Sequence, residues 1–450
     1  MNIVIVGGGT VGSAICMQLA KEEHNVTIVD SNGEALAEIA DSCDVFGVVG
    51  NGADISVLRK AGAASADLLI AVSPEDEINI LCCAAARKLG TRHTVARVRN
   101  PEYSELMVLL KNDMNLSFTI NPELAAAKEI YRILRFPAAA KIDTFCQGRV
   151  ELAEFVVAKE SPLCGVSLID LRKKLNTKFL VCGVLRNGEA HIPSGDFCIQ
   201  AGDTVCITAP EKEIVKFFKS IGVYKNPIKN LLIVGGGRTT YYLQNLLRDG
   251  KIRSTVIEKN AELCHELVED FDCTVICDNG SRQETLLEAG IENADAFLAL
   301  SDVDEENAII SMYAKTQNVG KIVTMISKMS YVDFFKSAGL ESIVSPRSST
   351  AAQILRYVRS MTNSRGSAIE ALHKLMDDKV EALELSVRES LDGITDIPLK
   401  QLRPRSGVLV ACIVRGTDVI IPSGDDFIAK GDRVIVVCTK GRINGIEDIV

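Results

Sequence analysis

Three glycines near the start of the chain have the spacing of a phosphate-binding turn. Gly7, Gly9 and Gly12 form the pattern GxGxxG directly after the apolar run IVIV and directly before a helical pattern. The first glycine permits a sharp turn, the second lets the backbone approach a pyrophosphate, and the third lets the helix pack closely on the strand. Free amides at the start of the helix attract the anion. Strand, turn and helix thus follow in the order that such a site needs.

An acidic residue stands at the distance that a dinucleotide site requires. Asp30 closes the next apolar run, TIVD, and lies 18 positions after Gly12 (30 − 12). A carboxylate at this place accepts hydrogen bonds from the hydroxyls of a ribose, and its charge repels a 2′-phosphate. The pattern therefore predicts NAD or an adenine nucleotide rather than NADP. The alternative interpretation is a tight turn followed by a surface aspartate.

Further polar residues follow the later apolar runs, where the carboxyl ends of parallel strands meet and open α/β sheets bind their ligands. Arg97 and Arg99 alternate along the fifth expected strand, in TVARVRNPEY, so we expect both side chains on one face of that strand, where they could neutralise phosphates. A solvated or ion-paired role is the alternative for each arginine. The other candidates after these runs are Asn51, Gly52, Asp54, Ser73 and Pro74.

The chain contains the same arrangement twice. The triplet GGG at Gly7 recurs at Gly235, 228 positions later (235 − 7), and under this shift 24 of the 79 pairs between residues 2–80 and 230–308 are identical. The motif IPSGD at 192–196 recurs at 421–425. The order is therefore A, B, A′, B′, and a repeat of this kind is read before single motifs.

The second copy of the glycine motif differs from the first. Glu258 takes the place of Asp30, but Thr240 replaces the third glycine, and Met325 and Ser327 replace the two arginines. A β-branched residue at the helix–strand contact should push the helix outward and loosen its hold on a pyrophosphate. We therefore predict a second site that is weaker or differently tuned.

The elements needed to position these residues follow from periodicity. Segments A and A′ alternate apolar strands with helical stretches, which predicts parallel sheets built from βαβ units. Segments B and B′ show short strands, turn residues at Asn187-Gly188 and Gly202-Asp203, and in B one short helix near 168–175. The fold class expected is α/β, with two Rossmann-like doubly wound parallel-sheet domains, each followed by a small α+β domain. The expected boundaries are 1–121, a connecting helix at 122–140, 141–223, 228–345, a connecting helix at 346–365, and 366–450.

Composition excludes several classes. The net charge of −9 has the wrong sign for a surface that binds nucleic acid, and no apolar run reaches the length of a membrane-spanning helix. The first residues, MNIVIVGGG, lack the features of a signal peptide, so we expect a cytoplasmic chain. The 14 cysteines form no CxxC pair, and most are expected to be reduced core residues, including Cys16, Cys182, Cys206, Cys412 and Cys438.

No catalytic pattern accompanies the nucleotide motif. The sequence has no GxSxG and no P-loop, and segments B and B′ are too small to enclose a substrate. We therefore expect ligand binding without covalent chemistry, no catalytic residues and no metal site. The five histidines lie in unrelated segments and are expected to be solvated or structural: His24, His93, His191, His265 and His373.

Several motifs together resemble the TrkA family, the peripheral subunits of Trk potassium-uptake systems. They are GGGTVG, Asp30, GNGAD at 50–54, AGAASADLLIAVSPEDEINILCCAAARKLG, ARVRNPEY and the duplicated IPSGD modules, and together they span the whole chain. The resemblance implies tandem RCK domains in a homo-oligomeric ring at the inner face of the cell membrane. It also implies binding of NAD(H) and of ATP or ADP, and gating of a membrane potassium translocator of the Trk type.

The resemblance also assigns site residues in both halves. In the first half it implies Gly7, Gly8, Gly9, Thr10, Val11, Gly12, Asp30, Asn51, Gly52, Ser73, Pro74 and Arg97, with Arg99 as a further candidate. In the second half it implies Gly235, Gly236, Gly237, Arg238, Thr239, Glu258, Asn279, Gly280 and Ser301. Two other functions stay open at this stage, an NAD-dependent oxidoreductase and a nucleotide- or redox-sensing regulator of a potassium antiporter.

Overall fold

The apolar runs of segments A and A′ form the buried strands of two parallel sheets. The structure is a computed structural model of the chain. It describes residues 1–103, 117–136, 139, 141–175, 177–222, 228–248, 252–340, 342–361, 367–376, 379–439, 443 and 445–450.

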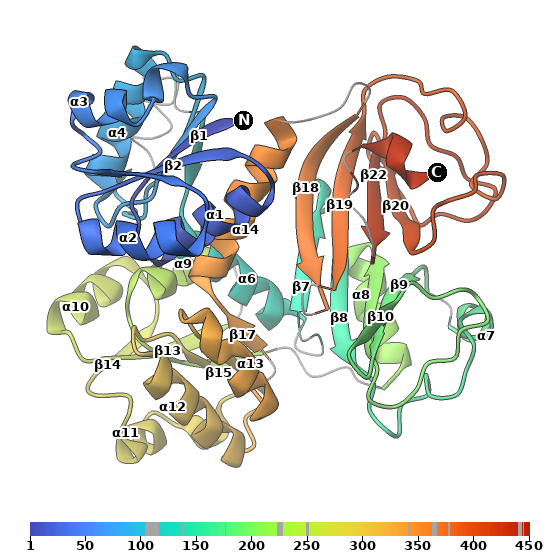
Figure 1. The fold of residues 1–450 in the computed structure, drawn as a ribbon. Coiled ribbons are helices and arrows are strands. Elements are labelled where there is room, and N and C mark those ends of the chain that lie inside the picture. The colour runs from blue at the N-terminus through green and yellow to red at the C-terminus, as the bar shows by residue number, and fades with distance from the viewer. Residues whose placement is uncertain are drawn as a thin grey trace. The chain divides into compact units, whose positions relative to one another are not determined.

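The first parallel sheet has the strand order β3-β2-β1-β4-β5-β6, in which the order reverses between β1 and β4. This doubly wound order places a crevice at the carboxyl ends of β1 and β4. Figure 1 shows α1 and α2 on one face of the sheet and α3 and α4 on the other. The strands are β1 (Asn2–Val6), β2 (Asn25–Asp30), β3 (Phe46–Val49), β4 (Leu68–Ala71), β5 (His93–Arg97) and β6 (Phe118–Ile120), and the helices are α1 (Thr10–Lys21), α2 (Gly33–Ser42), α3 (Ile55–Lys60) and α4 (Asp76–Leu89).

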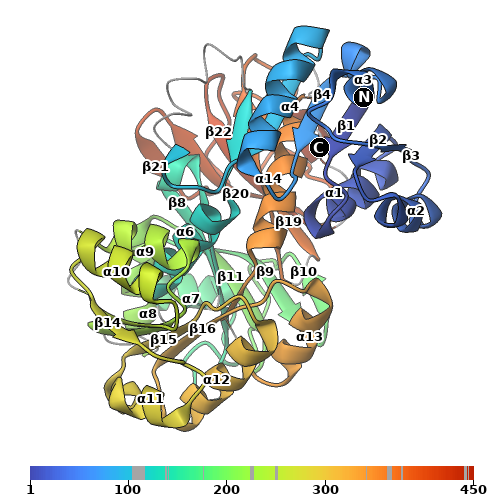
Figure 2. The same ribbon diagram turned by 90° about the vertical axis from the view of Figure 1, so that its left-hand side faces the viewer.

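The second parallel sheet repeats this topology with the order β14-β13-β12-β15-β16-β17. Figures 1 and 2 show α9 and α10 on one face and α11 and α12 on the other. Its strands are β12 (Asn230–Val234), β13 (Arg253–Glu258), β14 (Thr274–Cys277), β15 (Ala296–Ala299), β16 (Lys321–Met325) and β17 (Ser342–Val344). Its helices are α9 (Arg238–Leu247), α10 (Ala261–Asp270), α11 (Gln283–Glu288), α12 (Asp304–Thr316) and α13 (Met329–Ser337).

Segments B and B′ form two five-stranded antiparallel sheets, ordered β10-β9-β11-β8-β7 and β18-β19-β22-β20-β21. The first sheet contains β7 (Lys141–Phe145), β8 (Val150–Val156), β9 (Leu180–Arg186), β10 (Glu189–His191) and β11 (Thr204–Ala209), with helices α7 (Leu168–Lys174) and α8 (Glu211–Ser220). The second sheet contains β18 (Ser367–Leu375), β19 (Val380–Val387), β20 (Val408–Arg415), β21 (Asp418–Ile420) and β22 (Arg433–Cys438). The predicted fold class is thus confirmed.

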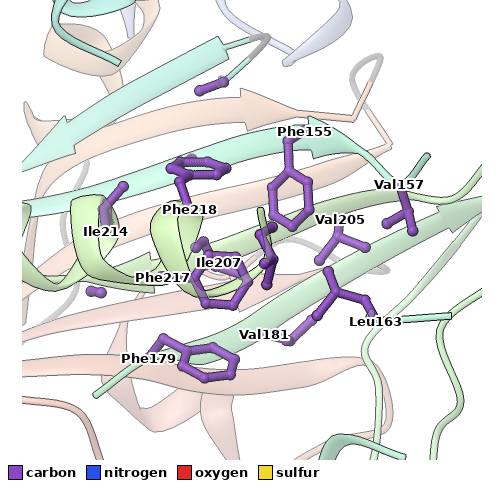
Figure 3. Close-up of a cluster of buried hydrophobic side chains, with 14 of the residues drawn as sticks. Phe155, Val157, Leu163, Phe179, Val181, Val205, Ile207, Ile214, Phe217 and Phe218 are labelled. Carbon is purple, nitrogen blue, oxygen red and sulfur yellow. The ribbon is translucent and has the colours of Figure 1, made fainter. Parts of the chain in front are cut away.

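The expectation of a single short helix in segment B was wrong. Helix α8 follows β11, and its residues Ile214, Phe217 and Phe218 are buried at helical spacing. Figure 3 shows these side chains packed with Phe155 of β8 and Phe179, which precedes β9. The sequence signal was present in EKEIVKFFKS, where apolar residues recur at helical intervals.

Two long helices follow the parallel sheets, α6 (Pro122–Arg135) and α14 (Pro346–Met361). The C-terminal parts of the two expected connecting helices, residues 137–138, 140 and 362–365, lie outside the described residues. The contacts between residues divide the chain into two compact units, and two of the boundaries between these units fall inside α6 and α14. One unit contains both parallel sheets (Met1–Tyr131 and Lys229–Leu355), and the other contains both antiparallel sheets (Arg132–Ile228 and Arg356–Val450).

Candidate nucleotide-binding site

In the glycine-rich turn after β1, the first and third glycines pack tightly against backbone atoms, whereas the second faces free space. Gly7 has φ +105°, and a Cβ on it would lie 2.8 Å from the backbone nitrogen of Ser73, so no larger residue fits there. A Cβ on Gly12 would lie 1.8 Å from the carbonyl oxygen of Gly7, so α1 packs directly on the turn. A Cβ on Gly9 would meet no atom within 4 Å. Since Gly9 is also the N-cap of α1 and no side chain caps this helix, the first-turn amides face an open cradle.

Asp30 at the end of β2 holds this turn in place. Its Oδ2 accepts the backbone N–H of Gly8 at 2.5 Å, and its Oδ1 accepts the N–H of Asn32 at 2.8 Å. A carboxylate has about four lone-pair positions, so these two bonds leave acceptor capacity for ribose hydroxyls. Asp30 is only partly buried, which keeps that capacity accessible.

The second half reproduces this geometry. Gly235 has φ +104°, and a Cβ on Gly237 would meet no atom within 4 Å. The Oε2 of Glu258 accepts the N–H of Gly236 at 2.6 Å, and its Oε1 accepts the N–H of Asn260 at 2.8 Å. The longer glutamate thus forms the same two hydrogen bonds as the aspartate of the first half.

Asn79 positions the chain segments that follow β4 and β5. The sequence indicated it only through its repetition as Asn307 in the second half. Its side chain is fully buried in α4; Oδ1 accepts the N–H of Ser73 at 2.8 Å, and Nδ2 donates to the carbonyls of Ser73 and Arg97 at 3.0 and 2.9 Å. These bonds join the ends of β4 and β5 at the edge of the crevice. Asn307 forms the corresponding bonds to Ser301 and Met325.

Arg97 carries a charge that lacks a full set of partners. Its Nη2 donates to the carbonyl oxygen of Ser73 at 2.5 Å, but its buried Nε has no acceptor among the described residues. Burial, and then the neighbouring charge of Arg99, lower the pKa of Arg97 to about 10. A phosphate would satisfy such a guanidinium by charge and by hydrogen bonding.

Arg99 is already neutralised within the chain. It lies beyond β5, which ends at Arg97, so the expectation that both arginines lie within the strand was wrong. The backbone N–H of Arg99 donates to the buried carboxylate of Asp76 at 2.7 Å, its Nε lies 3.4 Å from the same group, and its Nη2 donates to the carbonyl of Pro74. Both side chains nonetheless point toward the loop after β4. In the second half, Asp304 takes the place of Asp76 and accepts the N–H groups of Ser327 and Lys328, which follow β16.

The two halves differ at the position of the third glycine. Thr240 is buried, and its Oγ1 donates to the carbonyl of Gly235 at 2.5 Å, in the place where Gly12 leaves no room for a Cβ. Helix α9 must therefore lie farther from its turn than α1 does. The arginine position is occupied by Met325, whose Sδ lies 4.0 Å from the Oγ1 of Thr239, so this position of the second crevice carries no charge.

The remaining predicted residues shape the loops around the crevice. Asn51 and Asn279 each accept an N–H two residues ahead, from Ala53 at 2.9 Å and Ser281 at 3.0 Å. Asp54 caps α3 by accepting the N–H of Ser56. At Gly52 a Cβ would lie 2.2 Å from Val6, and at Gly280 it would lie 2.5 Å from Val234, so both loops pack tightly on the first strand. Thr10 and Arg238 are the exposed first residues of α1 and α9, and Val11 is buried. The Oγ of Ser73 donates to the backbone carbonyl of Glu75.

Neither a metal centre nor a membrane span is found in the described part of the chain. No cluster of three or more His, Cys, Asp or Glu side chains among these residues could hold a metal ion. No described helix combines the length and apolar character needed to cross a bilayer. All 14 cysteines are free, and the five predicted core cysteines (Cys16, Cys182, Cys206, Cys412 and Cys438) are buried, which confirms their expected role.

Comparison with known proteins identifies the family. Residues 3–117 and 231–346 match the TrkA-N domain, and residues 152–222 and 392–450 match the TrkA-C domain. The chain is 32% identical to a Trk system potassium uptake protein TrkA homolog of Archaeoglobus fulgidus, with all of both chains covered. The chain belongs to the TrkA family. A TrkA of Halomonas elongata is also 32% identical, over 99% of this chain and 98% of its own length.

Solved structures support the fold of this TrkA-family chain. A structure described as the GsuK channel bound to NAD matches with a TM-score of 0.64 and 19% identity, covering 97% of this chain and 76% of that one. The GsuK RCK domain matches with a TM-score of 0.63 and 19% identity, covering 97% and 92%. The tandem arrangement of parallel and antiparallel sheets is therefore that of RCK domains.

Proposed function

We propose that this chain is a regulatory subunit that binds NAD(H), with ATP and ADP as further ligands, and thereby gates a membrane potassium-uptake protein of the Trk type. The observation that carries the proposal is the open cradle at Gly9. The carboxylate of Asp30 holds Gly8 of the same turn, and Arg97, whose Nε lacks an acceptor among the described residues, bonds Ser73, which lies against Gly7. In one adenine nucleotide, the pyrophosphate would lie at Gly9, the ribose hydroxyls would bond Asp30, and Arg97 would offset the phosphate charge.

The nature of the ligand follows from the same groups and is supported by related structures. Asp30 favours a free 2′-hydroxyl and disfavours a 2′-phosphate. GsuK, which shares the fold, is described bound to NAD and, in another structure, bound to ADP. The second site, with Thr240 and Met325 in place of Gly12 and Arg97, binds more weakly or prefers a different nucleotide.

The proposed mechanism is a shift between conformations driven by binding energy. A ligand changes the equilibrium between two arrangements only by the difference in its affinity for them. Nucleotides that contact the crevice differently therefore favour different arrangements of the RCK domains, and the attached potassium translocator opens or closes. No residue acts as a catalyst in this scheme, and the nucleotide leaves unchanged.

The proposal assigns nucleotide binding to residues 1–121 and 228–345, with 122–140 and 346–365 as connecting helices and 141–223 and 366–450 as C-terminal domains. The assembly is a homo-oligomeric ring at the cytoplasmic face of the membrane, and nucleic acid is not a partner. Leu81 of α4 and Ile309 of α12, 228 positions apart, are 54% and 66% exposed. Apolar side chains exposed at the same place in both halves are suited to contacts between copies.

Titration calorimetry on the full chain with NAD, NADH, ATP and ADP tests nucleotide binding. Potassium uptake in cells that depend on the subunit tests gating. We expect Gly9→Val and Asp30→Ala to abolish the nucleotide dependence of uptake while circular dichroism still shows the native fold. A normal response to nucleotide in both variants would show that the first site is not the sensor. Consumption of NADH with a carbonyl substrate would instead favour an oxidoreductase.

A further inference from the structure

The second half carries a pair of thiols beside the carboxylate that we assign to the ribose. Cys264 lies on α10, and its Sγ donates to the backbone carbonyl of Glu258 at 3.3 Å. Cys277 ends β14 and is the register partner of Glu258 in the neighbouring strand. Paired residues of adjacent strands lie about 5 Å apart and project their side chains to the same face. Helix α10 packs against β14, and the thiol of Cys264 lies near enough to that of Cys277 for the two to interact electrostatically.

The two thiols differ in accessibility. Cys277 is exposed, whereas Cys264 is buried with 8% of its surface accessible. Burial, and then the contact with Cys277, raise the pKa of Cys264 to about 11. Cys264 is therefore protonated at neutral pH, and an oxidant from solvent meets Cys277 first.

The pair is specific to the second half. The positions 228 residues earlier are Leu36 and Val49, which cannot form a disulfide. The nearby Cys273 is an unsuitable partner for Cys277, because four residues of extended strand separate their Cα atoms by roughly 13 Å, beyond the reach of a disulfide at about 7 Å. Cys16 and Cys43 of the first half also interact electrostatically, but neither is exposed as Cys277 is, so this pair offers an internal comparison.

We propose that Cys264 and Cys277 are a redox-sensitive dithiol that regulates nucleotide binding at the second site. This inference rests on the proposed function, since it requires that the second crevice binds a nucleotide. The oxidant is a hydroperoxide such as hydrogen peroxide. The sulfur of Cys277 attacks one peroxide oxygen, the O–O bond breaks, and a sulfenic acid and water form. The sulfur of Cys264 then attacks the sulfenic sulfur, the S–S bond forms, and a second water leaves.

In the overall reaction, two thiols and one hydrogen peroxide give one disulfide and two waters. Two electrons from an external thiol restore the reduced pair. The disulfide removes the S–H donor from the carbonyl of Glu258 and ties α10 to the end of β14. Because the carboxylate of Glu258 holds the N–H of Gly236, this change reaches the turn that receives the phosphate. The loss of one such hydrogen bond corresponds to roughly tenfold in affinity.

The test uses the full chain carrying Asp30→Ala, so that nucleotide binding reports on the second half. After hydrogen peroxide and alkylation, peptide mapping by mass spectrometry should find a linkage between Cys264 and Cys277, reversible by a thiol. ADP and NAD should bind roughly tenfold more weakly to the oxidised protein than to the reduced one. Bound nucleotide should also slow alkylation of Cys277 in the reduced protein.

The variants Cys264→Ser and Cys277→Val, the latter introducing the residue found at position 49, should lose the response to peroxide. Cys16→Ser should retain it, which excludes the first-half pair as its origin. If the reduced protein binds no nucleotide in its second half, the proposed function of that half and the regulation both fail. If it binds, then an absent Cys264–Cys277 linkage, or a linkage with unchanged affinity, would overturn this inference alone.

Discussion

Glu154 of β8 and Glu384 of β19 occupy equivalent positions of the two antiparallel-sheet modules, and each accepts a backbone N–H from the other module. The Oε2 of Glu384 accepts the N–H of Cys146 at 2.8 Å, and both carboxylate oxygens of Glu154 lie 3.3 Å from the nitrogen of Met376. Cys146 and Met376 both have positive φ, 51° and 52°, and are separated by the same 230 positions as the glutamates (376 − 146, 384 − 154). The duplicated modules thus pack together as two copies of a symmetric dimer would.

The first prediction concerns this reciprocal contact. Glu384→Ala leaves the buried N–H of Cys146 and the guanidinium of Arg433, which donates to Glu384 Oε1 at 3.1 Å, without their acceptor. The free energy of unfolding should fall by about 1–3 kcal/mol, as measured by urea unfolding. Glu389→Ala, at an exposed position of the following loop, is the matched control and should cost less than about 0.5 kcal/mol. Equal losses in the two variants would contradict the assigned role.

The second prediction concerns pH. Glu151 of β8 is 3% exposed, and its Oε2 has no hydrogen-bond partner among the described residues. Burial raises the pKa of Glu151 from 4.5 to about 7, against the opposing charges of Arg135 and Arg132. The folded state therefore binds more protons than the unfolded state between pH 4.5 and 7. The contribution of Glu151 to stability falls as pH rises through this window and is constant above it.

Glu151→Gln removes this dependence. The variant should match the wild type near pH 4 and exceed it above pH 7, by at most roughly 3 kcal/mol for a shift of this size. Urea unfolding of both proteins at pH 4, 5, 6, 7 and 8 measures the difference, and Glu189→Gln at an exposed position is the control. A difference that does not vary with pH would show that Glu151 has the same pKa in the folded and unfolded states.

The third prediction separates binding from stability at Arg97. Arg97→Met introduces the residue found at the equivalent position 325 and removes a desolvated charge whose Nε lacks an acceptor in the described part of the chain. Nucleotide affinity in the first half should fall by about tenfold or more, while the free energy of unfolding should stay equal or rise by about 1–3 kcal/mol. Calorimetry and thermal unfolding measure the two effects.

Arg92→Met is the control for this prediction. Its side chain is 77% exposed, and the substitution should change neither nucleotide affinity nor stability. A destabilised Arg97→Met protein would assign this arginine to structure instead.

Much of the fold follows from patterns that the sequence displays directly. The apolar runs, the spacing of the glycines and the internal duplication predicted two doubly wound domains, each followed by a small α+β domain, because strand burial and turn geometry restrict residue types locally. The pairing of like modules across more than 200 residues was not predicted. It depends on contacts such as Glu384 with the N–H of Cys146, whose partners no local pattern identifies.

The site was predicted unevenly for the same reason. Glycines and the ribose-type carboxylates stand in one contiguous motif, so their places could be expected. Asn79 and Asp76 lie on α4 and act on the ends of β4 and β5 through backbone groups, which carry no residue-type signal. Their only trace in the sequence is identity between the two halves, Asn79 with Asn307 and Asp76 with Asp304. Repetition of a buried polar residue within a duplicated chain is thus a usable signal for positioning residues.

The last prediction compares two glycines of the same turn, which the structure assigns to different tasks. A Cβ at position 12 would lie 1.8 Å from the carbonyl oxygen of Gly7, whereas a Cβ at position 9 would meet nothing within 4 Å. Gly12→Ala must push α1 away from the turn and should lower the free energy of unfolding by about 1–3 kcal/mol. Gly9 has φ −67°, which alanine adopts without strain, so Gly9→Ala should leave stability within about 0.5 kcal/mol.

Nucleotide binding should show a different pattern in the two variants. The methyl group of Gly9→Ala occupies the space that a pyrophosphate would fill, so the affinity of the first half should fall by about tenfold or more although the fold is intact. Thermal unfolding and calorimetry on the same preparations separate the two effects, and Gly237→Ala repeats the substitution at the equally open position of the second half. A Gly9→Ala protein that binds normally would show that phosphate does not approach this turn. The carboxylate of Asp30 would then serve only to hold the loop through Gly8 and Asn32.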